Sequence, residues 1–263
     1  MTNILEGIHI TQRFGGVVAI NDFSFSIEKD RIVAIIGPNG AGKTTAFNII
    51  TGVYCPTEGQ VKYCGASADG KPKDITNMRP DKIAKLGIAR TFQNIRLFPQ
   101  QTVLDNILLG QHLHVHSSLI GAVLKYPFYY KEEKVMREKG MELLDKIGLA
   151  DQAGADAVSL PYGLQRKLEI IRALSSGPRL LLLDEPAAGM NPQETMELTE
   201  FIHEVRDKFN VSILLIEHHM DLVMEIAEDI YVLDFGKMIA HGKPEEIQND
   251  PNVITAYLGE GDI

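Results

Sequence analysis

A glycine-rich segment near the N-terminus constrains this chain more than any other feature. Residues 37–44 read Gly-Pro-Asn-Gly-Ala-Gly-Lys-Thr, which satisfies the G-x-x-x-x-G-K-[ST] spacing of a phosphate-binding loop. The apolar run Ile32–Ile36 precedes it and predicts a buried strand, and residues 44–50 follow with helical character. Because such a loop needs both a strand and a helix beside it, we favour this interpretation over a glycine-rich turn without a ligand.

Each residue type in the loop suits phosphate binding. Glycines let the backbone wrap closely around the phosphates and turn its N–H groups inward. Lys43 is placed to reach the β- and γ-phosphates, Thr44 offers a hydroxyl to Mg²⁺, and the positive end of the helix faces the anion. The predicted nucleotide-binding residues of this segment are Gly37, Pro38, Asn39, Gly40, Ala41, Gly42, Lys43, Thr44 and Thr45.

Two carboxylates after a second apolar run supply the other half of the predicted site. Residues 180–183 are four leucines, and Asp184, Glu185 and Pro186 follow them. Ligand-binding groups gather where the strands of an α/β sheet end, so Asp184 is expected to hold Mg²⁺ through water. Glu185 is then placed to act as the general base that polarises the attacking water. Two acids in an ordinary turn would be the simpler interpretation if the phosphate loop were absent.

Strand and helix patterns alternate on both sides of a central helical stretch. Residues 103–149 carry apolar residues at helical spacing. Outside that stretch the patterns predict strands over 8–14, 23–27, 32–36, 180–183 and 211–216, hairpins over 55–64 and 230–241, and helices over 44–50, 193–209 and 220–227. The predicted fold class is α/β, a phosphate-loop core with an antiparallel β element and an inserted helical subdomain.

Composition excludes several classes of function. The hydrophobic share is 44% and the charged share 23%, which is ordinary for a globular protein. A net charge of -9 without a basic block argues against nucleic-acid binding. Cys55 and Cys64 are expected to be reduced thiols, since no secretory signal is visible. No apolar window is long enough to cross a bilayer, so any membrane contact is expected from a partner.

Three further segments narrow the class of phosphate-loop protein. Gln93 ends the sequence Arg-Thr-Phe-Gln, residues 160–170 read Leu-Pro-Tyr-Gly-Leu-Gln-Arg-Lys-Leu-Glu-Ile, and residues 217–220 read Glu-His-His-Met. Together with the two phosphate motifs they resemble the nucleotide-binding subunit of ABC transporters, over nearly the whole chain. The resemblance implies one ABC ATPase domain over residues 1–263. Its ATP-binding core would comprise 1–92 and 170–263, and its mainly helical subdomain about 93–169.

The resemblance also implies roles for residues outside the loop. Phe14 matches the aromatic residue that stacks on adenine, although a strand-end core position is the alternative. Gln93 matches the glutamine that contacts Mg²⁺ and the attacking water. His218 matches the histidine at the γ-phosphate, with adjacent His219 as the alternative. The implied catalytic residues are Glu185, His218 and Gln93, and the implied metal ligands are Thr44, Gln93 and Asp184.

Residues 160–165 resemble the signature loop, which contacts the ATP held by the opposite subunit. Gly163 would make this contact in trans. The segment departs from the common Leu-Ser-Gly-Gly-Gln pattern at Pro161 and Tyr162, and proline brings neither a hydroxyl nor an N–H, so we expect a weaker trans contact. Asn191 stands where aspartate is usual in the dimer-interface loop. Two different partner subunits would accommodate both departures.

A closer likeness concerns residues 90–98, 168–170, 184–192 and 257–260, which resemble the LivG-type ATPases of branched-chain amino-acid importers. It implies ATP-driven dimer closure and hydrolysis-driven opening, with ATP and Mg²⁺ as cofactors. The implied partners are a second ABC ATPase subunit in a homodimer or heterodimer, membrane permease subunits and, indirectly, a solute-binding protein, with no nucleic acid. The chain would lie at the cytoplasmic face of the membrane.

Several alternatives stay open. The chain could power urea or amide uptake or lipopolysaccharide export, or be an ABC ATPase without a transport role. A phosphate-loop kinase outside the ABC family is a further class. His112, His114 and His116 alternate but lack acidic or cysteine partners, so we favour a solvated or partner-facing loop over a metal site. The aromatic residues 128–130 suit either core packing or contact with a membrane subunit.

Overall fold

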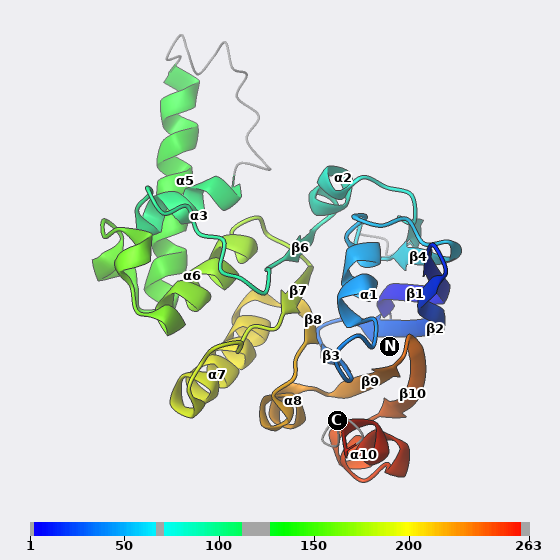
Figure 1. The fold of residues 1–263 in the computed structure, drawn as a ribbon. Coiled ribbons are helices and arrows are strands. Elements are labelled where there is room, and N and C mark those ends of the chain that lie inside the picture. The colour runs from blue at the N-terminus through cyan, green and yellow to red at the C-terminus, as the bar shows by residue number, and fades with distance from the viewer. Residues whose placement is uncertain (1–2, 67–70, 112–126, 259–263) are drawn as a thin grey trace. The chain divides into compact units, whose positions relative to one another are not determined.

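The computed structural model describes residues 3–66, 71–111 and 127–258 (Figure 1). Contacts divide the chain into two compact units. Unit 1 comprises residues 1–93 and 179–263, and unit 2 comprises residues 94–178. Within the described residues, no helix has the length and apolarity needed to cross a membrane.

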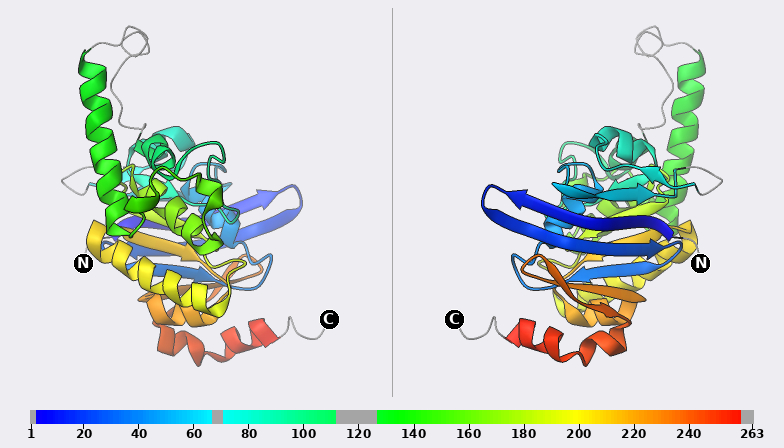
Figure 2. Two further views of the ribbon diagram at one scale, coloured as in Figure 1. Left: turned by 90° about the vertical axis from the view of Figure 1, so that its left-hand side faces the viewer. Right: turned by 90° about the vertical axis from the view of Figure 1, so that its right-hand side faces the viewer.

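The first sheet of unit 1 is antiparallel and has four strands in the order β2-β1-β4-β5. Its strands are β1 (Asn3–Phe14), β2 (Val17–Glu28), β4 (Glu58–Tyr63) and β5 (Lys73–Asp74). Figure 2 shows β1 and β2 as a long antiparallel pair. A turn at Gly15-Gly16 joins them. The predicted hairpin over residues 55–64 is wrong, because that segment contains one strand, β4, which pairs with β1 and β5.

The second sheet carries the phosphate loop and has six strands in the order β10-β9-β3-β8-β7-β6. Its strands are β3 (Ile32–Ile36), β6 (Ile88–Arg90), β7 (Leu180–Asp184), β8 (Ser212–Ile216), β9 (Asp229–Asp234) and β10 (Lys237–Gly242). All neighbours pair in parallel except β9 and β10, which form the predicted hairpin. Every residue of β3, β7 and β8 is buried, as expected of strands covered on both faces.

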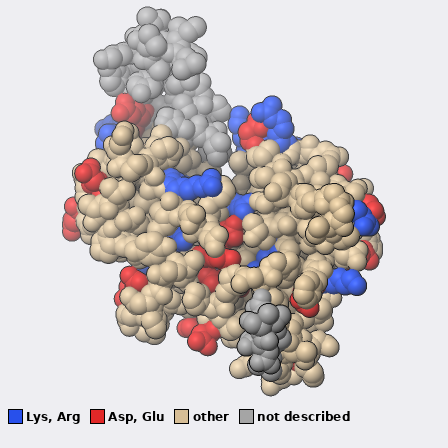
Figure 3. All heavy atoms as spheres, in the orientation of Figure 1, with Lys and Arg blue, Asp and Glu red and all other residues tan. Residues whose placement is uncertain are grey.

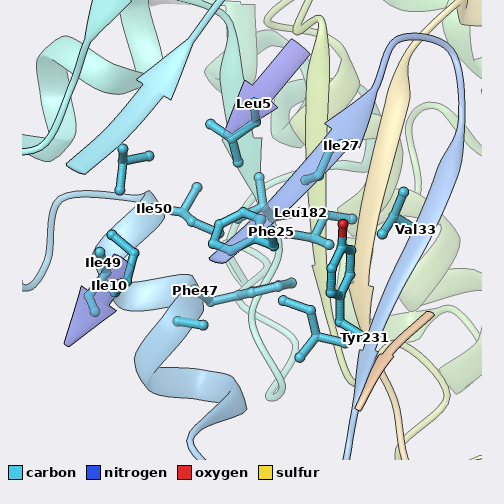
Figure 4. Packing of buried hydrophobic residues seen from close by; sticks show 14 of the residues in the cluster. Leu5, Ile10, Phe25, Ile27, Val33, Phe47, Ile49, Ile50, Leu182 and Tyr231 are labelled. Atoms are coloured by element: carbon cyan, nitrogen blue, oxygen red, sulfur yellow. The ribbon is translucent and has the colours of Figure 1, made fainter. Parts of the chain in front are cut away.

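The core of unit 1 lies between the two sheets and around α1 (Lys43–Ile50). Phe47 and Ile50 of α1 pack with Leu5 and Phe25 of the antiparallel sheet and Leu182 of the parallel sheet, as Figure 4 shows. Both helical residues are fully buried. Because α1 follows the phosphate loop directly, this packing fixes the loop between the two sheets.

The remaining helices of unit 1 are α2 (Pro80–Lys85), α7 (Pro192–Phe209), α8 (Met220–Ile226), α9 (Pro244–Gln248) and α10 (Pro251–Leu258). The start of α7 is defined by a capping box. The side chain of Asn191 accepts a hydrogen bond from Glu194 N at 3.0 Å, and Glu194 accepts one from Asn191 N at 3.1 Å. Asparagine and aspartate cap helices about equally well, so Asn191 meets this structural need in place of the usual aspartate.

The regular elements of unit 2 that the structure describes are helices. They are α3 (Val103–Gln111), α5 (Pro127–Lys146), α6 (Tyr162–Leu174) and the 3-10 turns η2 (Ala150–Gln152) and η3 (Ala157–Ser159). The prediction of helix in the central stretch is confirmed for α3 and α5. An ion pair between Arg166 and Glu169 is buried inside α6 at 2.8 Å, and Glu169 also accepts a hydrogen bond from Arg96 N at 3.0 Å.

Candidate nucleotide-binding and hydrolysis site

The phosphate loop passes close to its neighbours through backbone that only glycine tolerates. Gly37 has φ 146°, and a Cβ atom there would lie 2.0 Å from the carbonyl oxygen of Leu233. The tip of the β9–β10 hairpin also holds the loop, because Gly236 N–H donates to Ala41 O at 3.0 Å. Lys43 is 5% exposed, and its Nζ donates to the carbonyl oxygens of Gly37 and Pro38 at 2.5 and 2.8 Å. The lysine is therefore aimed into the loop.

The other predicted nucleotide-binding residues of this segment differ in their exposure. Asn39, Gly40 and Thr44 are exposed, and Thr45 is partly buried in the first turn of α1. Phe14 lies at the end of β1, is 43% exposed and contacts Tyr54 edge to face, with ring centroids 5.1 Å apart. An aromatic face that stays exposed beside a second aromatic ring is available for stacking on a planar base.

Four neighbouring parallel strands, β3, β8, β7 and β6, end at the same edge of the sheet. The phosphate loop follows β3, Asp184 ends β7, and Glu185, Gln93 and His218 stand within three residues of the ends of β7, β6 and β8. The carboxyl ends of parallel strands are where open α/β sheets bind ligands. The topology therefore gathers the predicted catalytic groups of unit 1.

Glu185 is held between the other two predicted catalytic residues. Its Oε2 accepts a hydrogen bond from Gln93 Nε2 at 2.6 Å, and its Oε1 lies 2.7 Å from His218 Nε2. The backbone of Glu185 has φ 46°, an uncommon conformation for a residue other than glycine, and its N–H donates to Ile216 O at 2.9 Å. Strained backbone of this kind clusters at functional sites, where the surrounding structure imposes it.

Glu217 is a buried carboxylate whose role the sequence pattern does not reveal. It is 1% exposed, and its Oε1 accepts from Ala187 N at 2.7 Å. Its Oε2 accepts from His218 N at 2.9 Å and from His219 N at 3.3 Å. Glu217 thus ties the loop after Glu185 to the loop that carries His218. The available sequence signal was a charged residue directly after the buried strand β8.

The two histidines differ in their contacts. His218 pairs with Glu185, whereas His219 Nδ1 lies 3.2 Å from Glu217 Oε2 and its side chain is 47% exposed. Only His218 therefore contacts a predicted catalytic residue. This geometry favours His218 over His219 for the role at the γ-phosphate.

The segment that resembles the signature loop lies in unit 2. Pro161 is the N-cap residue of α6, without a side-chain capping bond, and its carbonyl accepts from Gln165 N at 3.0 Å. Gly163 is in the first turn of α6, and Tyr162 is 40% exposed. A proline at this position leaves the helix start intact while removing the serine hydroxyl. His112, His114 and His116 lie outside the described residues, as do the side chains of residues 128–130.

The predicted metal ligands suit Mg²⁺ bound together with nucleotide phosphates. Mg²⁺ in such sites takes one or two carboxylates, and the rest of its ligands are phosphate oxygens and water. Asp184 at the end of β7 would supply one carboxylate, and Thr44 at the start of α1 would supply a hydroxyl. Within the described part of the chain, no cluster of three or more His, Cys, Asp or Glu residues could hold a metal by itself. The donor set therefore fits a metal that depends on nucleotide.

The fold and this arrangement of loops define a phosphate-loop ATPase of the cassette type. The family described as ABC transporter matches residues 20–188, and a family described as branched-chain amino acid ATP-binding cassette transporter matches residues 237–263. This chain belongs to the ABC transporter family, as an ATP-binding ATPase subunit.

Curated relatives match along almost the entire chain. The high-affinity branched-chain amino acid transport ATP-binding protein BraF of Pseudomonas aeruginosa is 44% identical, with 98% of each chain covered. The corresponding protein LivG of Escherichia coli is 45% identical, with 95% of this chain and 96% of LivG covered. A crystal structure of an ABC transporter cassette in its ADP conformation superposes with a TM-score of 0.84 at 32% identity, covering 98% of this chain and 100% of that chain. These matches confirm the predicted ABC ATPase fold and the predicted resemblance.

Proposed function

We propose that this chain powers the import of branched-chain amino acids by binding and hydrolysing Mg–ATP. The observation that supports the transport assignment is the identity of 44–45% with BraF and LivG over 98% and 95% of this chain. In addition, the family described as branched-chain amino acid ATP-binding cassette transporter matches residues 237–263. Phosphate-loop motifs alone would leave the transported solute open.

The proposed hydrolysis centres on Glu185. Gln93 and His218 hold its two carboxylate oxygens at 2.6 and 2.7 Å, so the carboxylate is oriented before it accepts a proton from the attacking water. Lys43 and the N–H groups of the phosphate loop bind the β- and γ-phosphates, and Phe14 stacks on adenine. Thr44, Asp184 and Gln93 would hold Mg²⁺, which supplies charge neutralisation of the phosphates when it is bound.

We further propose that two such subunits close around ATP. Gly163 and the start of α6 would contact the γ-phosphate held by the opposite subunit, and the proline at 161 would weaken that contact. ATP shifts the pair toward the closed form only because it binds that form more tightly than the open one. Hydrolysis removes the bridging phosphate and the pair reopens. The partner would be either a second copy or a related ATPase subunit.

The proposed location is the cytoplasmic face of the membrane, through permease subunits that follow the dimer motion. A solute-binding protein would deliver the amino acid to those permeases. A nucleic-acid partner is not proposed, because the net charge is -9. Figure 3 supports this view, since lysines and arginines are interspersed with acidic residues over the described part of the face shown.

Uptake and hydrolysis measured together test this proposal. Cells that lack the chain should lose high-affinity uptake of radiolabelled leucine, isoleucine and valine, and the wild-type chain should restore it. Glu185→Gln should still bind ATP but should hydrolyse it at least about 100-fold more slowly and restore no uptake. Restored uptake of urea or short amides instead of leucine would assign a different solute. Unchanged hydrolysis in Glu185→Gln would overturn Glu185 as the base.

A further inference from the structure

Arg90 joins three structural elements of unit 1 through one buried guanidinium. It is the last residue of β6, and its Nη2 donates to Asp184 Oδ2 at the end of β7 at 2.6 Å. Its Nη1 donates to Asn48 Oδ1 and Thr51 Oγ1 of α1 and its C-cap, at 2.8 and 3.3 Å. A planar guanidinium with several donors in fixed directions can hold such partners in one geometry.

Burial makes these contacts strong and specific. The side chains of Arg90 and Asp184 are 9% and 6% exposed. The guanidinium carbon also lies over two aromatic rings, 5.5 Å from the centroid of Phe47 and 5.2 Å from that of Phe92. Cation–π contacts strengthen when water is excluded, and a buried charge left without a partner is strongly unfavourable. Arg90 therefore has one well-defined position.

The helix and the strand that Arg90 contacts each carry a predicted metal ligand, and a third predicted ligand follows Arg90 in the chain. Asn48 lies four residues after Thr44 in α1, so the two share one face of that helix. Asp184 is itself a predicted ligand, and the chain runs from Arg90 directly to Gln93. Since the arginine donates to Oδ2 of Asp184, the other carboxylate oxygen would be the one left to hold the metal.

We propose that Arg90 is a positioning residue that sets the affinity of the site for Mg²⁺. It fixes the spacing between α1, which carries Thr44, and the end of β7, which carries Asp184, and it orients the Asp184 carboxylate. This role rests on the proposed Mg–ATP function. Residues that orient metal ligands from the second layer typically change metal affinity by about 10–100-fold when they are replaced.

Two other roles would give different results. A purely structural arginine would contribute to the stability of unit 1 without affecting the metal. An arginine that competes with Mg²⁺ for Asp184 would weaken metal binding, so its removal would increase the affinity for Mg²⁺. The dependence of ATP binding on Mg²⁺ concentration separates all three roles, because positioning alone predicts that removal lowers this affinity.

The experiment titrates ATP by calorimetry at increasing Mg²⁺ concentrations, and in EDTA. It uses the full-length Glu185→Gln protein, in which slow hydrolysis leaves the nucleotide intact during the titration. Arg90→Lys keeps the positive charge but loses the planar set of donors of the guanidinium, and Arg90→Gln loses both. We expect each to raise the half-saturating Mg²⁺ concentration by about 10-fold or more, with ATP affinity in EDTA within about twofold of the background protein. Asn48→Ala should raise it by a smaller factor, since it removes the contact to Asn48 and leaves those to Thr51 and Asp184 in place.

Arg206→Lys is the matched control. Like Arg90, Arg206 lies in unit 1 and forms an ion pair, in its case with Glu228 Oε1 at 2.9 Å. Its side chain is half-buried, and it contacts no predicted metal ligand. It should leave the half-saturating Mg²⁺ concentration unchanged even if it lowers the melting temperature. If Arg90→Gln does not fold, Arg90→Lys and Asn48→Ala carry the test.

Three results would decide against this role. An unchanged half-saturating Mg²⁺ concentration in the folded Arg90→Lys protein would make the arginine structural. A lowered concentration would make it a competitor of the metal. If the ATP affinity of the Glu185→Gln protein without further substitutions does not depend on Mg²⁺, the proposed Mg–ATP function itself is wrong, and so is the role of Arg90.

Discussion

Nε2 of His218 lies 2.7 Å from Oε1 of Glu185, across the ends of the neighbouring parallel strands β8 and β7. Residues 33 positions apart in the chain are thus brought within hydrogen-bonding distance by the pairing of two strands. The second carboxylate oxygen of Glu185 is held by Gln93, which follows the next strand of the sheet, β6. The order of the strands therefore determines which side chains can orient the proposed base.

Replacement of His218 should affect hydrolysis far more than replacement of its neighbour. His218→Ala removes a hydrogen-bond partner of Glu185, so we expect the ATPase rate to fall by about 100-fold or more, the usual contribution of a positioned acid–base group. His219→Ala is the natural control, because His219 contacts Glu217 rather than Glu185. Steady-state phosphate release from both variants measures the difference. Equal losses in the two variants would contradict the assignment of His218.

Glu217→Gln should slow hydrolysis and lower stability together. The glutamine amide has one acceptor oxygen, so it cannot accept from Ala187 N on one side and from His218 N on the other. One backbone N–H would be left buried without a partner, which lowers the free energy of unfolding by about 1–3 kcal/mol. The loop after Glu185 and the loop that carries His218 would also lose their connection. Urea denaturation and ATPase assays on the same protein measure the two effects.

Glu204→Gln is a suitable control for this variant. Glu204 pairs with Lys208 at 2.8 Å on the surface of α7, with its side chain 53% exposed. Exposed pairs of this kind contribute little, so stability and hydrolysis should both stay near those of the wild type. A Glu217→Gln protein that behaves like this control would show that the buried carboxylate has no organising role.

Gly37→Ala should abolish nucleotide binding through the backbone of the phosphate loop. The added methyl group would meet Leu233 O at 2.0 Å, and φ 146° is unfavourable for alanine. Backbone strain alone is worth about 1–3 kcal/mol, and relief of the clash requires the loop to move away from β9. Gly154→Ala is the control, since a Cβ atom there meets nothing within 4 Å. Equilibrium binding of a fluorescent ATP analogue compares the two.

Tyr63 should make unit 1 less stable at high pH. Burial raises the pKa of its hydroxyl from 10.0 to about 12, and the side chain is fully buried with a hydrogen bond to Gly87 O. The folded state therefore keeps this proton in a range where the unfolded chain has lost it. The stabilising contribution is complete below pH 10, decreases as pH rises toward 12 and amounts to about 2–3 kcal/mol in total.

Denaturation with urea at pH 9 and pH 11 tests this expectation. Phenylalanine cannot ionise, so only the wild type should lose this contribution as the pH rises. The unfolding free energy of the wild type minus that of Tyr63→Phe should therefore be smaller at pH 11 than at pH 9. A constant difference over that range would mean that the hydroxyl of Tyr63 titrates alike in the folded and unfolded chain.

Local pattern predicts the elements around the phosphate loop well. The strand before the loop, the helix after it and the leucine run before Asp184 are each continuous in the sequence, and the structure contains them as β3, α1 and β7. The segment 55–64 was predicted wrongly because β4 pairs with β1, far away in the sequence, and because β5 has only two residues. β6, with three residues, is too short to produce a periodic signal.

The contacts of the site depend on tertiary structure in a way that motifs do not reveal. Glu185 was predicted from its place after the leucine run, and Gln93 and His218 were named from resemblance. Nothing in the spacing of the three shows that Gln93 and His218 hold the two carboxylate oxygens of Glu185. Arg90 and Glu217 were visible in the quoted motifs without any assigned role. Both became recognisable only through burial, since a buried charge requires partners and those partners proved to be in the site.

The four identical leucines of β7 have a consequence for how the central sheet is aligned. All four are fully buried, and three of them lie beside apolar residues of β8, whereas Leu180 lies beside Ser212. Sliding β7 by one residue would therefore still place most of the leucines against apolar side chains. Hydrophobicity alone therefore cannot distinguish the correct pairing from its neighbours. The distinction comes at the end of the strand, where Asp184 meets Arg90 and Glu185 N meets Ile216 O. The acidic end of β7 thus fixes the register of this strand in the sheet, so a substitution at Asp184 would disturb strand pairing as well as the predicted metal site.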